Sequence, residues 1–232
     1  MCGRYSLSKT KQDLQDRFEA EMLPKFQPRY NIAPTQLVPV ITSQSPTGFS
    51  FFYWGITPDF GKNRPVSQKL INARAETVAE KISFKSSFQK RRCIIPADGF
   101  YEWKNLGKKT KIPYRFTLRD DELFSFAGIW EEFEGVDGEI QHTFIILTTS
   151  PNEIMHEVHD RMPVILTKET EKIWLDNHSE EEKLKNLFSP FSAKSMLSYT
   201  VSPLVNSVKN DQPSVINRTA PMDQHGNYTL FG

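Results

Sequence analysis

Short runs of β-branched and aromatic residues, separated by turn signals, are the feature of this 232-residue chain that most limits its fold. Glycine-containing turns such as Asn105-Leu106-Gly107 and Gly135-Val136-Asp137-Gly138 stand between successive runs. This spacing is typical of antiparallel hairpins, so it predicts a mostly antiparallel sheet. The predicted strands cover residues 37–42, 49–54, 92–96, 99–104, 112–118, 123–131 and 140–148.

Helical signals are fewer. Ser8 is predicted to cap a helix that ends near Glu21, with Leu14 and Phe18 on its inner face. Residues 24–36 contain three prolines and little periodicity, so they are predicted to form an ordered loop. Further helices are predicted over residues 168–177 and after the capping boxes Ser150–Glu153 and Ser179–Glu182.

These patterns predict an α+β fold. We expect a single domain over residues 1–232, with a mostly antiparallel, barrel-like sheet core flanked by helices. A hydrophobic content of 38% is enough for a sizeable core at this length. The segment from Cys2 to Tyr5 is predicted to be a strand that enters the core region.

The sequence also bears on the compartment. No run of about 18 apolar residues is present, and the first twenty residues lack the apolar stretch of a signal peptide. The chain contains two cysteines, Cys2 and Cys93, which does not indicate a disulfide framework. We therefore expect a cytoplasmic protein, with no membrane partner, whose Cys2 stays reduced and whose Cys93 lies in the core.

Cys2 suggests a particular chemistry. Its side chain is small enough for a methionine aminopeptidase to remove Met1, which would leave an N-terminal residue with a free α-amine and a thiol. The amine of such a 1,2-aminothiol condenses with an aldehyde to a Schiff base, and the thiol then closes a thiazolidine ring. The alternative is that cysteine at position 2 is incidental.

The charges are unevenly distributed. The formal net charge is +1, but residues 61–115 hold 14 Lys or Arg against 4 Asp or Glu, a local net of +10 that leaves −9 for the rest. Aromatic residues in or beside this stretch include Trp54, Phe84, Phe88 and Tyr101. Cations that bind phosphates and rings that stack on bases suit single-stranded nucleic acid, although a solvated surface is the other interpretation.

Three further segments place polar residues in apolar surroundings. Asn72 and Arg74 are two apart, so they can point to one side of an extended segment, or be a cap and a surface cation. Glu102 lies between two aromatic residues, which raises the pKa of a carboxyl unless the side chain faces water. His159 is either a general acid or base, or a loop histidine with satisfied hydrogen bonds.

Cofactors have little support. His156 and His159 are three apart, but the chain has no His-Glu-x-x-His or Cys-x-x-Cys motif. No Gly-x-Gly-x-x-Gly or Walker-type loop is present either. We therefore expect no metal and no other cofactor.

Seven segments, taken together and in order, resemble the SOS-response-associated peptidase (SRAP) family of abasic-site processing proteins. They are Met1-Cys2-Gly3-Arg4-Tyr5, Tyr30-Asn31-Ile32-Ala33-Pro34-Thr35, Trp54-Gly55-Ile56, Asn72-Ala73-Arg74-Ala75-Glu76, Ile95-Pro96-Ala97-Asp98-Gly99-Phe100-Tyr101-Glu102-Trp103, Ala127-Gly128-Ile129-Trp130 and His159-Asp160-Arg161-Met162-Pro163. The resemblance implies a monomeric SRAP fold that binds single-stranded DNA, or junctions of single- and double-stranded DNA, at abasic sites. It also implies contact with the replication machinery and a place at the nucleoid when DNA is bound.

The resemblance implies a covalent mechanism as well. Cys2 would form a thiazolidine DNA–protein cross-link with the ring-opened deoxyribose and shield the site, with slow self-reversal. Glu102 would relay protons, His159 would assist ring opening and Schiff-base formation, and Asn72 would hydrogen-bond the captured sugar. The implied DNA contacts are Arg4 and Arg74 to phosphates, Pro34, Trp54 and Phe60 as an apolar floor and wedge, and Asn31, Trp103 and Thr148.

Two other functions remain open from the sequence. One is an N-terminal-nucleophile cysteine peptidase, in which the Cys2 thiol attacks the amide bond after Met1. The other is a non-catalytic single-stranded DNA-binding module, for which the basic and aromatic stretch would suffice. Substitution of Cys2 separates these functions, because only a binding module loses nothing.

Overall fold

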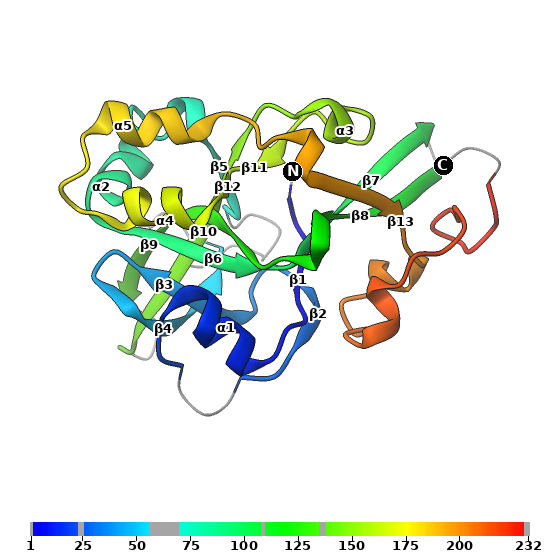
Figure 1. Ribbon diagram of the computed structural model, residues 1–232, viewed down its shortest axis with the longest axis horizontal. Coiled ribbons are helices and arrows are strands. Elements are labelled where there is room, and N and C mark those ends of the chain that lie inside the picture. The colour runs from blue at the N-terminus through cyan, green and yellow to red at the C-terminus, as the bar shows by residue number, and fades with distance from the viewer. Residues whose placement is uncertain (1, 23–25, 56–69, 108–109, 135–137, 230–232) are drawn as a thin grey trace.

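Two β-sheets with short helices packed against them make up the fold in the computed structural model (Figure 1). The structure describes residues 2–22, 26–55, 70–107, 110–134 and 138–229. The predicted α+β class with a barrel-like, mostly antiparallel core is confirmed. The strands are β1 (Tyr5–Leu7), β2 (Arg29–Ile32), β3 (Leu37–Thr42), β4 (Ser45–Trp54), β5 (Asn72–Arg74), β6 (Arg92–Ala97), β7 (Gly99–Gly107), β8 (Thr110–Leu118), β9 (Phe124–Glu134), β10 (Ile140–Thr149), β11 (Met162–Pro163), β12 (Ile165–Leu166) and β13 (Met196–Thr200). The α-helices are α1 (Lys11–Phe18), α2 (Ile82–Lys90), α3 (Glu153–His156), α4 (Lys168–Leu175) and α5 (Glu181–Lys185).

Five strands close into a barrel within the described residues. β3 pairs with β4, β4 with β10, β10 with β9, β9 with β6, and β6 with β3, and only the β4–β10 pairing is parallel. Gly128 of β9 is required at one close approach, because a Cβ there would lie 2.4 Å from Ile95 Cδ1 and 2.8 Å from the Ile145 carbonyl oxygen. Strands β5, β11 and β12 extend the same sheet at β10 and β9.

The second sheet has the order β13-β8-β7-β1-β2. In it β1 lies between two partners, since Tyr5 is opposite Ile32 of β2 and Phe100 of β7. The chain passes from the barrel to this sheet at Asp98, between β6 and β7. This corner therefore fixes the N-terminal strand relative to both sheets.

Asp98 is the centre of a buried polar network at that corner. Its carboxylate accepts hydrogen bonds from Ser6 Oγ at 2.6 Å, Ser8 Oγ at 2.8 Å and Arg115 Nη2 at 2.9 Å. Gly99 lets the guanidinium approach, since a Cβ at this position would lie 2.7 Å from Arg115 Nε. A buried ion pair is tolerable only with such extra hydrogen bonds, so the network ties β1 to the sheet on one side.

Helices α2 and α4 pack over β6 and β9 of the barrel (Figure 1). Buried Arg92 joins them through its guanidinium, which donates to the carbonyls of Phe88 and Gln89 in α2 at 2.9 and 2.8 Å. The same group donates to the carbonyls of Trp174 and Asp176 at the end of α4 at 2.7 and 2.8 Å. Arg92 therefore satisfies the free carbonyls of two helix ends at once.

The predicted helix near the N-terminus exists, but its start is different. Thr10 is the N-cap, and its hydroxyl and the Asp13 carboxylate form a capping box. Ser8 was predicted to be the cap, and it is instead committed to Asp98. The two residues compete for the same role by sequence pattern, and the tertiary contact of Ser8 decides between them.

Other predicted boundaries were wrong for similar reasons. The segment 24–36 contains strand β2, because Ile32 pairs with Tyr5 across the sheet. Strand β1 begins only at Tyr5. Asn152 caps α3, and Glu180 precedes α5. The elements that the sequence did not predict are α2, β5 and β13.

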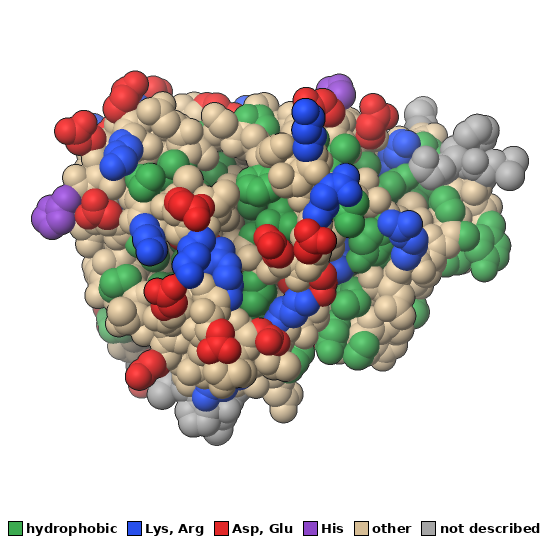
Figure 2. Space-filling view, in the orientation of Figure 1, with side chains coloured by type: hydrophobic (Ala, Val, Ile, Leu, Met, Phe, Trp, Pro, Cys, Tyr) green, Lys and Arg blue, Asp and Glu red, His purple; other side chains and the backbone are tan. Residues whose placement is uncertain are grey.

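The basic and aromatic stretch is less exposed than its sequence suggested. Arg92 and Arg115 are buried, as are Phe84, Phe88 and Tyr101. On the face in Figure 2, basic and acidic side chains are interleaved. These aromatic rings are therefore core residues rather than a stacking surface. Among the described residues, no helix is both long and apolar enough to cross a membrane.

Candidate active site

Cys2 is buried against β5, with 1% of its surface exposed. Asn72, the first residue of β5, donates a hydrogen bond from Nδ2 to the Cys2 carbonyl at 2.8 Å. The Oδ1 atom of Asn72 is also buried and has no hydrogen-bond partner among the described residues. Because a buried amide oxygen normally accepts a hydrogen bond, this atom is suited to receive one from a bound molecule.

Trp54 and Thr148 hold the backbone on either side of Asn72. Trp54 donates from Nε1 to the carbonyl of Ile71 at 3.0 Å, and Thr148 donates from Oγ1 to the carbonyl of Ala73 at 3.3 Å. Both side chains are fully buried. The expected base and phosphate contacts of Trp54 and Thr148 are therefore corrected: these residues position β5 from within the core.

Glu102 of β7 lies in the same site. Burial raises the pKa of its carboxyl, and the charge of His159 opposes that rise. Burial also raises the pKa of the Cys2 thiol, and the Glu102 carboxylate raises it further. These mutual effects mean that the thiol, the carboxyl and the imidazole are electrostatic neighbours. The raised pKa expected from the apolar surroundings of Glu102 is confirmed in direction.

His159 lies in the loop between α3 and β11. Its Nδ1 accepts a hydrogen bond from the backbone N–H of Arg161 at 3.0 Å. In the neutral ring this contact leaves the proton on Nε2, so that atom is the donor. Nδ1 also lies 3.0 Å from Asp160 Oδ1, an ion pair that forms only when the ring is protonated.

Arg4 is held by residues of the C-terminal part of the chain. Its Nη1 donates to Asn31 Oδ1 at 2.8 Å and to the carbonyl of Val205 at 2.7 Å, and its guanidinium lies 5.8 Å from the ring centroid of Trp103. Asn31 is fully buried, and its amide donates to carbonyls of residues 205–210. Asn31 was expected to contact DNA, and it instead supports Arg4 from below.

The other predicted DNA contacts have different surroundings. Arg74 is exposed at the end of β5, whereas Pro34 and Trp103 are partly exposed. Trp103 donates from Nε1 to Asn206 Oδ1 at 2.7 Å. Phe60, the predicted wedge, lies outside the described residues.

Two residues at the site received no role from the sequence. Arg161 donates from Nη1 to Glu76 Oε1 at 2.6 Å and from Nη2 to Glu76 Oε2 at 2.8 Å. Both occur in segments that already stood out, two residues after His159 and two after Arg74. Opposite charges in two such segments are the only signal that could have paired them.

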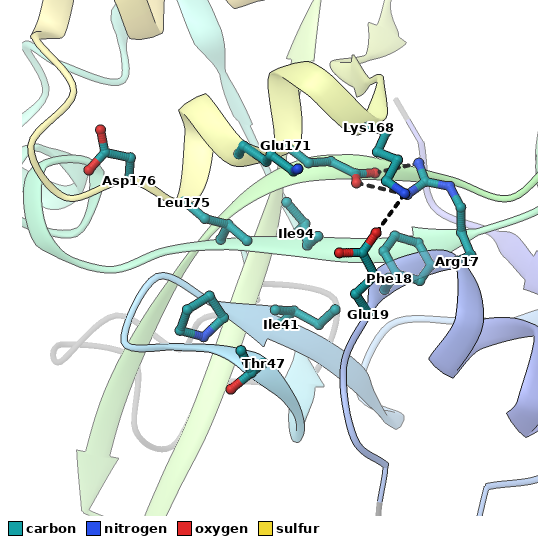
Figure 3. A pocket seen from close by; sticks show the side chains of 12 residues that line it. Arg17, Phe18, Glu19, Ile41, Thr47, Ile94, Lys168, Glu171, Leu175 and Asp176 are labelled. Carbon is teal, nitrogen blue, oxygen red and sulfur yellow. Dashed lines mark hydrogen bonds and ion pairs between the residues drawn. The ribbon is translucent and has the colours of Figure 1, made fainter.

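A separate pocket lies between α1, α4 and the barrel (Figure 3). Arg17 there donates to both carboxylate oxygens of Glu171, at 3.0 and 2.9 Å, and Lys168 pairs with Glu19 at 2.7 Å. Its floor is formed by Phe18 and other apolar side chains. None of the predicted site residues lines this pocket, so it is distinct from the site around Cys2.

Nucleophile, carboxyl and imidazole together can carry out addition to a carbonyl with proton transfer. The chain matches the family described as SOS response associated peptidase (SRAP) over residues 1–208. The chain belongs to the SRAP family. The resemblance drawn from the seven sequence segments is confirmed.

Relatives of this SRAP chain carry informative names. It is 44% identical over 221 residues to Abasic site processing protein YoqW of Bacillus subtilis (strain 168), covering 93% of this chain and 99% of that protein. It is 30% identical over 276 residues to Abasic site processing protein HMCES of Rattus norvegicus, covering 96% of this chain and 76% of that protein. A crystal structure of a Bacteroides thetaiotaomicron protein superposes with a TM-score of 0.84 at 29% identity, covering 94% of this chain and all of that one.

Proposed function

We propose that this SRAP chain processes abasic sites in DNA by trapping the ring-opened sugar on Cys2 after removal of Met1. The proposal is carried by the position of Cys2, which is buried beside Asn72 and Glu102 at the start of the chain. The names of the relatives, which are abasic site processing proteins, supply the substrate. A DNA aldehyde is also the partner that a 1,2-aminothiol requires.

The raised pKa of the thiol sets the order of the steps. A thiol that stays protonated near pH 7 is a poor first nucleophile, so the α-amine of Cys2 attacks C1′ of the sugar. The carbinolamine then loses water and becomes an imine. In the second step sulfur attacks the same carbon, the C=N electron pair moves to nitrogen, and the thiol proton leaves to a base.

Each neighbouring side chain has a role in these steps. His159, with its proton on Nε2, protonates the sugar oxygen and assists ring opening and loss of water. Glu102 accepts the thiol proton and returns it to nitrogen, and the same relay in reverse allows slow release. Asn72 Oδ1 accepts a hydrogen bond from a sugar hydroxyl.

DNA binding would rest on fewer side chains than expected. Arg4 and exposed Arg74 contact flanking phosphates, while Pro34 and Trp103 contact bases next to the lesion. Single-stranded DNA, or a junction with duplex DNA, suits this arrangement because an extruded sugar must reach a buried thiol. We propose a cytoplasmic monomer that meets such sites at replicating DNA.

Substitution of Cys2 tests the proposal. Cys2→Ala keeps an α-amine, so we expect reversible DNA affinity and a borohydride-trapped imine but no stable adduct on a denaturing gel. Cys2→Ser closes an oxygen ring of lower stability, so we expect a weaker adduct. Cys93→Ala is the matched control, because Cys93 is a fully buried core residue, and it should cross-link like the wild type.

The two other functions predict different results. An N-terminal-nucleophile peptidase would cleave a peptide that mimics its own N-terminus, in a reaction that depends on Cys2 and ignores DNA. A binding module would show the same DNA retention in Cys2→Ala and wild type. Either result would contradict the proposal.

A further inference from the structure

Arg161 and Glu76 form a bidentate ion pair beside the site. The two N–O distances are 2.6 and 2.8 Å, and the Arg161 side chain is only 14% exposed. Nη2 of Arg161 also donates to the carbonyl of Thr148, at the end of β10. Such a fork of hydrogen bonds fixes the orientation of the guanidinium, which a single contact would not do.

The ion pair joins two segments that are far apart in the sequence. Glu76 lies in the 3₁₀ turn Ala75–Thr77, directly after β5 and its Asn72. Arg161 directly precedes β11 and lies two residues after His159. Both strands pair with β10, where Thr148 is opposite Arg74 on one side and Pro163 on the other. The guanidinium therefore links three strand ends around the site.

The backbone of Arg161 acts on His159 directly. Its N–H donates to Nδ1 of the ring, which keeps the neutral proton on Nε2. Nε2 is the atom that the proposed function requires as proton donor. If the guanidinium lost its anchor, the backbone N–H would be free to turn away and the ring could adopt the other tautomer.

We propose that Glu76 and Arg161 are positioning residues that hold His159 in its Nε2–H tautomer and at a fixed distance from Asn72. This inference rests on the proposed function for its chemical consequence, but the tautomer itself does not depend on any reaction. Neither residue need touch the substrate.

A direct phosphate contact by Arg161 is the competing explanation. In that case Glu76 would compete with the phosphate for the guanidinium. Neutralising Glu76 would then release Arg161, and DNA affinity and cross-linking would both rise. Positioning predicts the opposite change in cross-linking and no change in affinity, so Glu76 is a more informative site of substitution than Arg161.

The experiment compares Glu76→Gln with Glu80→Gln. Both glutamates are exposed and lie close together in the sequence, so the two variants lose the same charge near the same segment. We expect Glu76→Gln to form the imine with an abasic oligonucleotide about 10- to 100-fold more slowly, with unchanged affinity for an intact oligonucleotide. Glu80→Gln should match the wild type. Imine formation is measured by borohydride trapping in the Cys2→Ala background.

A double-mutant cycle tests whether the effect passes through His159. In a His159→Gln background, Glu76→Gln should cause no further loss of rate, because the group it positions is absent. An equal loss in both backgrounds would overturn the inference, as would an unchanged or faster rate in Glu76→Gln alone. Glu76→Asp keeps the charge and should recover part of the rate.

Nitrogen NMR of the imidazole rings provides the readout that is independent of the reaction. The wild type should show His159 with a protonated Nε2 and an unprotonated Nδ1, and Glu76→Gln should show a mixture of tautomers. A ring that is unaffected by Glu76→Gln would overturn the inference even if wild-type protein cross-links normally. Wild-type protein that fails to cross-link, with the tautomer still dependent on Glu76, would overturn only the proposed function.

Discussion

At the scale of single residues, burial controls the chemistry of the site. Cys2 and Glu102 are both taken out of water, and burial raises the pKa of each. A neutral thiol next to a carboxyl of raised pKa can pass its proton to that carboxyl near neutral pH, whereas an ordinary carboxylate would be too weak a base. The two residues are therefore matched to each other by the same environment.

The Glu102→Gln variant tests this match. The amide keeps the size of the side chain but cannot accept the thiol proton, so we expect stable cross-linking to slow by about 100-fold or more. Reversible DNA affinity should be unchanged. Rates are measured under single-turnover conditions, with exposed Glu122→Gln as the control, and a rate within a factor of two or so of the wild type would contradict the assigned role.

The pH dependence follows from the direction of the shift. Because the pKa of Glu102 is raised on folding, its contribution to stability is present below the unfolded value of about 4.3 and is lost as pH rises through the folded value. Glu102→Gln should therefore have a higher Tm than the wild type at pH 8, with the difference narrowing towards pH 4. The wild-type cross-linking rate should fall as pH is lowered through that raised pKa.

Several of these residues were predictable from the sequence and others were not. The apolar neighbours of Glu102 predicted its raised pKa, and an unpaired thiol in an apolar strand predicted that Cys93 is buried. Trp54 and Thr148 carried no local signal of burial, because their contacts are with β5, a strand formed only by pairing with β10. Their roles could not be separated from surface contacts without the tertiary structure.

At the scale of elements, helices α2 and α4 depend on one buried guanidinium. Arg92→Ala would leave four carbonyl acceptors at the helix ends without their donor. We expect a loss of about 3–5 kcal/mol in the free energy of unfolding, measured by urea denaturation. Arg92→Lys should recover little, because one ammonium group cannot reach both helix ends.

The neighbouring Arg91 is the control for this prediction. Its guanidinium lies 5.9 Å from the ring centroid of Trp130 and it is only partly buried, so Arg91→Ala should cost about 1 kcal/mol or less. Equal losses for the two arginines would show that Arg92 is not the tether that its hydrogen bonds indicate.

Element boundaries show what local pattern can and cannot predict. The β-branched runs predicted most barrel strands, since their residues are buried on a pleated surface whatever the partner is. Strand β2 was missed because its neighbouring prolines favour a loop, and its pairing with β1 overrides that preference. Helix α2 was missed because Phe84 and Phe88, spaced at i and i+4, were interpreted as base-stacking residues rather than as one buried helix face.

At the scale of the whole molecule, the candidate site is built from both sheets. Cys2 leads into β1 and Glu102 lies on β7, both in the five-stranded sheet, whereas Asn72 and His159 belong to strand ends of the barrel sheet. The corner at Asp98 fixes these two parts relative to each other. The order of the residues in the sequence gave no indication of this arrangement, which depends on contacts between segments 70 and more residues apart.

The fold places the reactive end of the chain inside the molecule, so the account depends on a free α-amine at Cys2. Intact-mass spectrometry of the purified protein, before and after incubation with an abasic oligonucleotide, measures this directly. We predict a protein that lacks Met1 and a product whose mass is the sum of that protein and the oligonucleotide less one water. Protein that retains Met1 and still forms the adduct equally well would contradict the proposed chemistry.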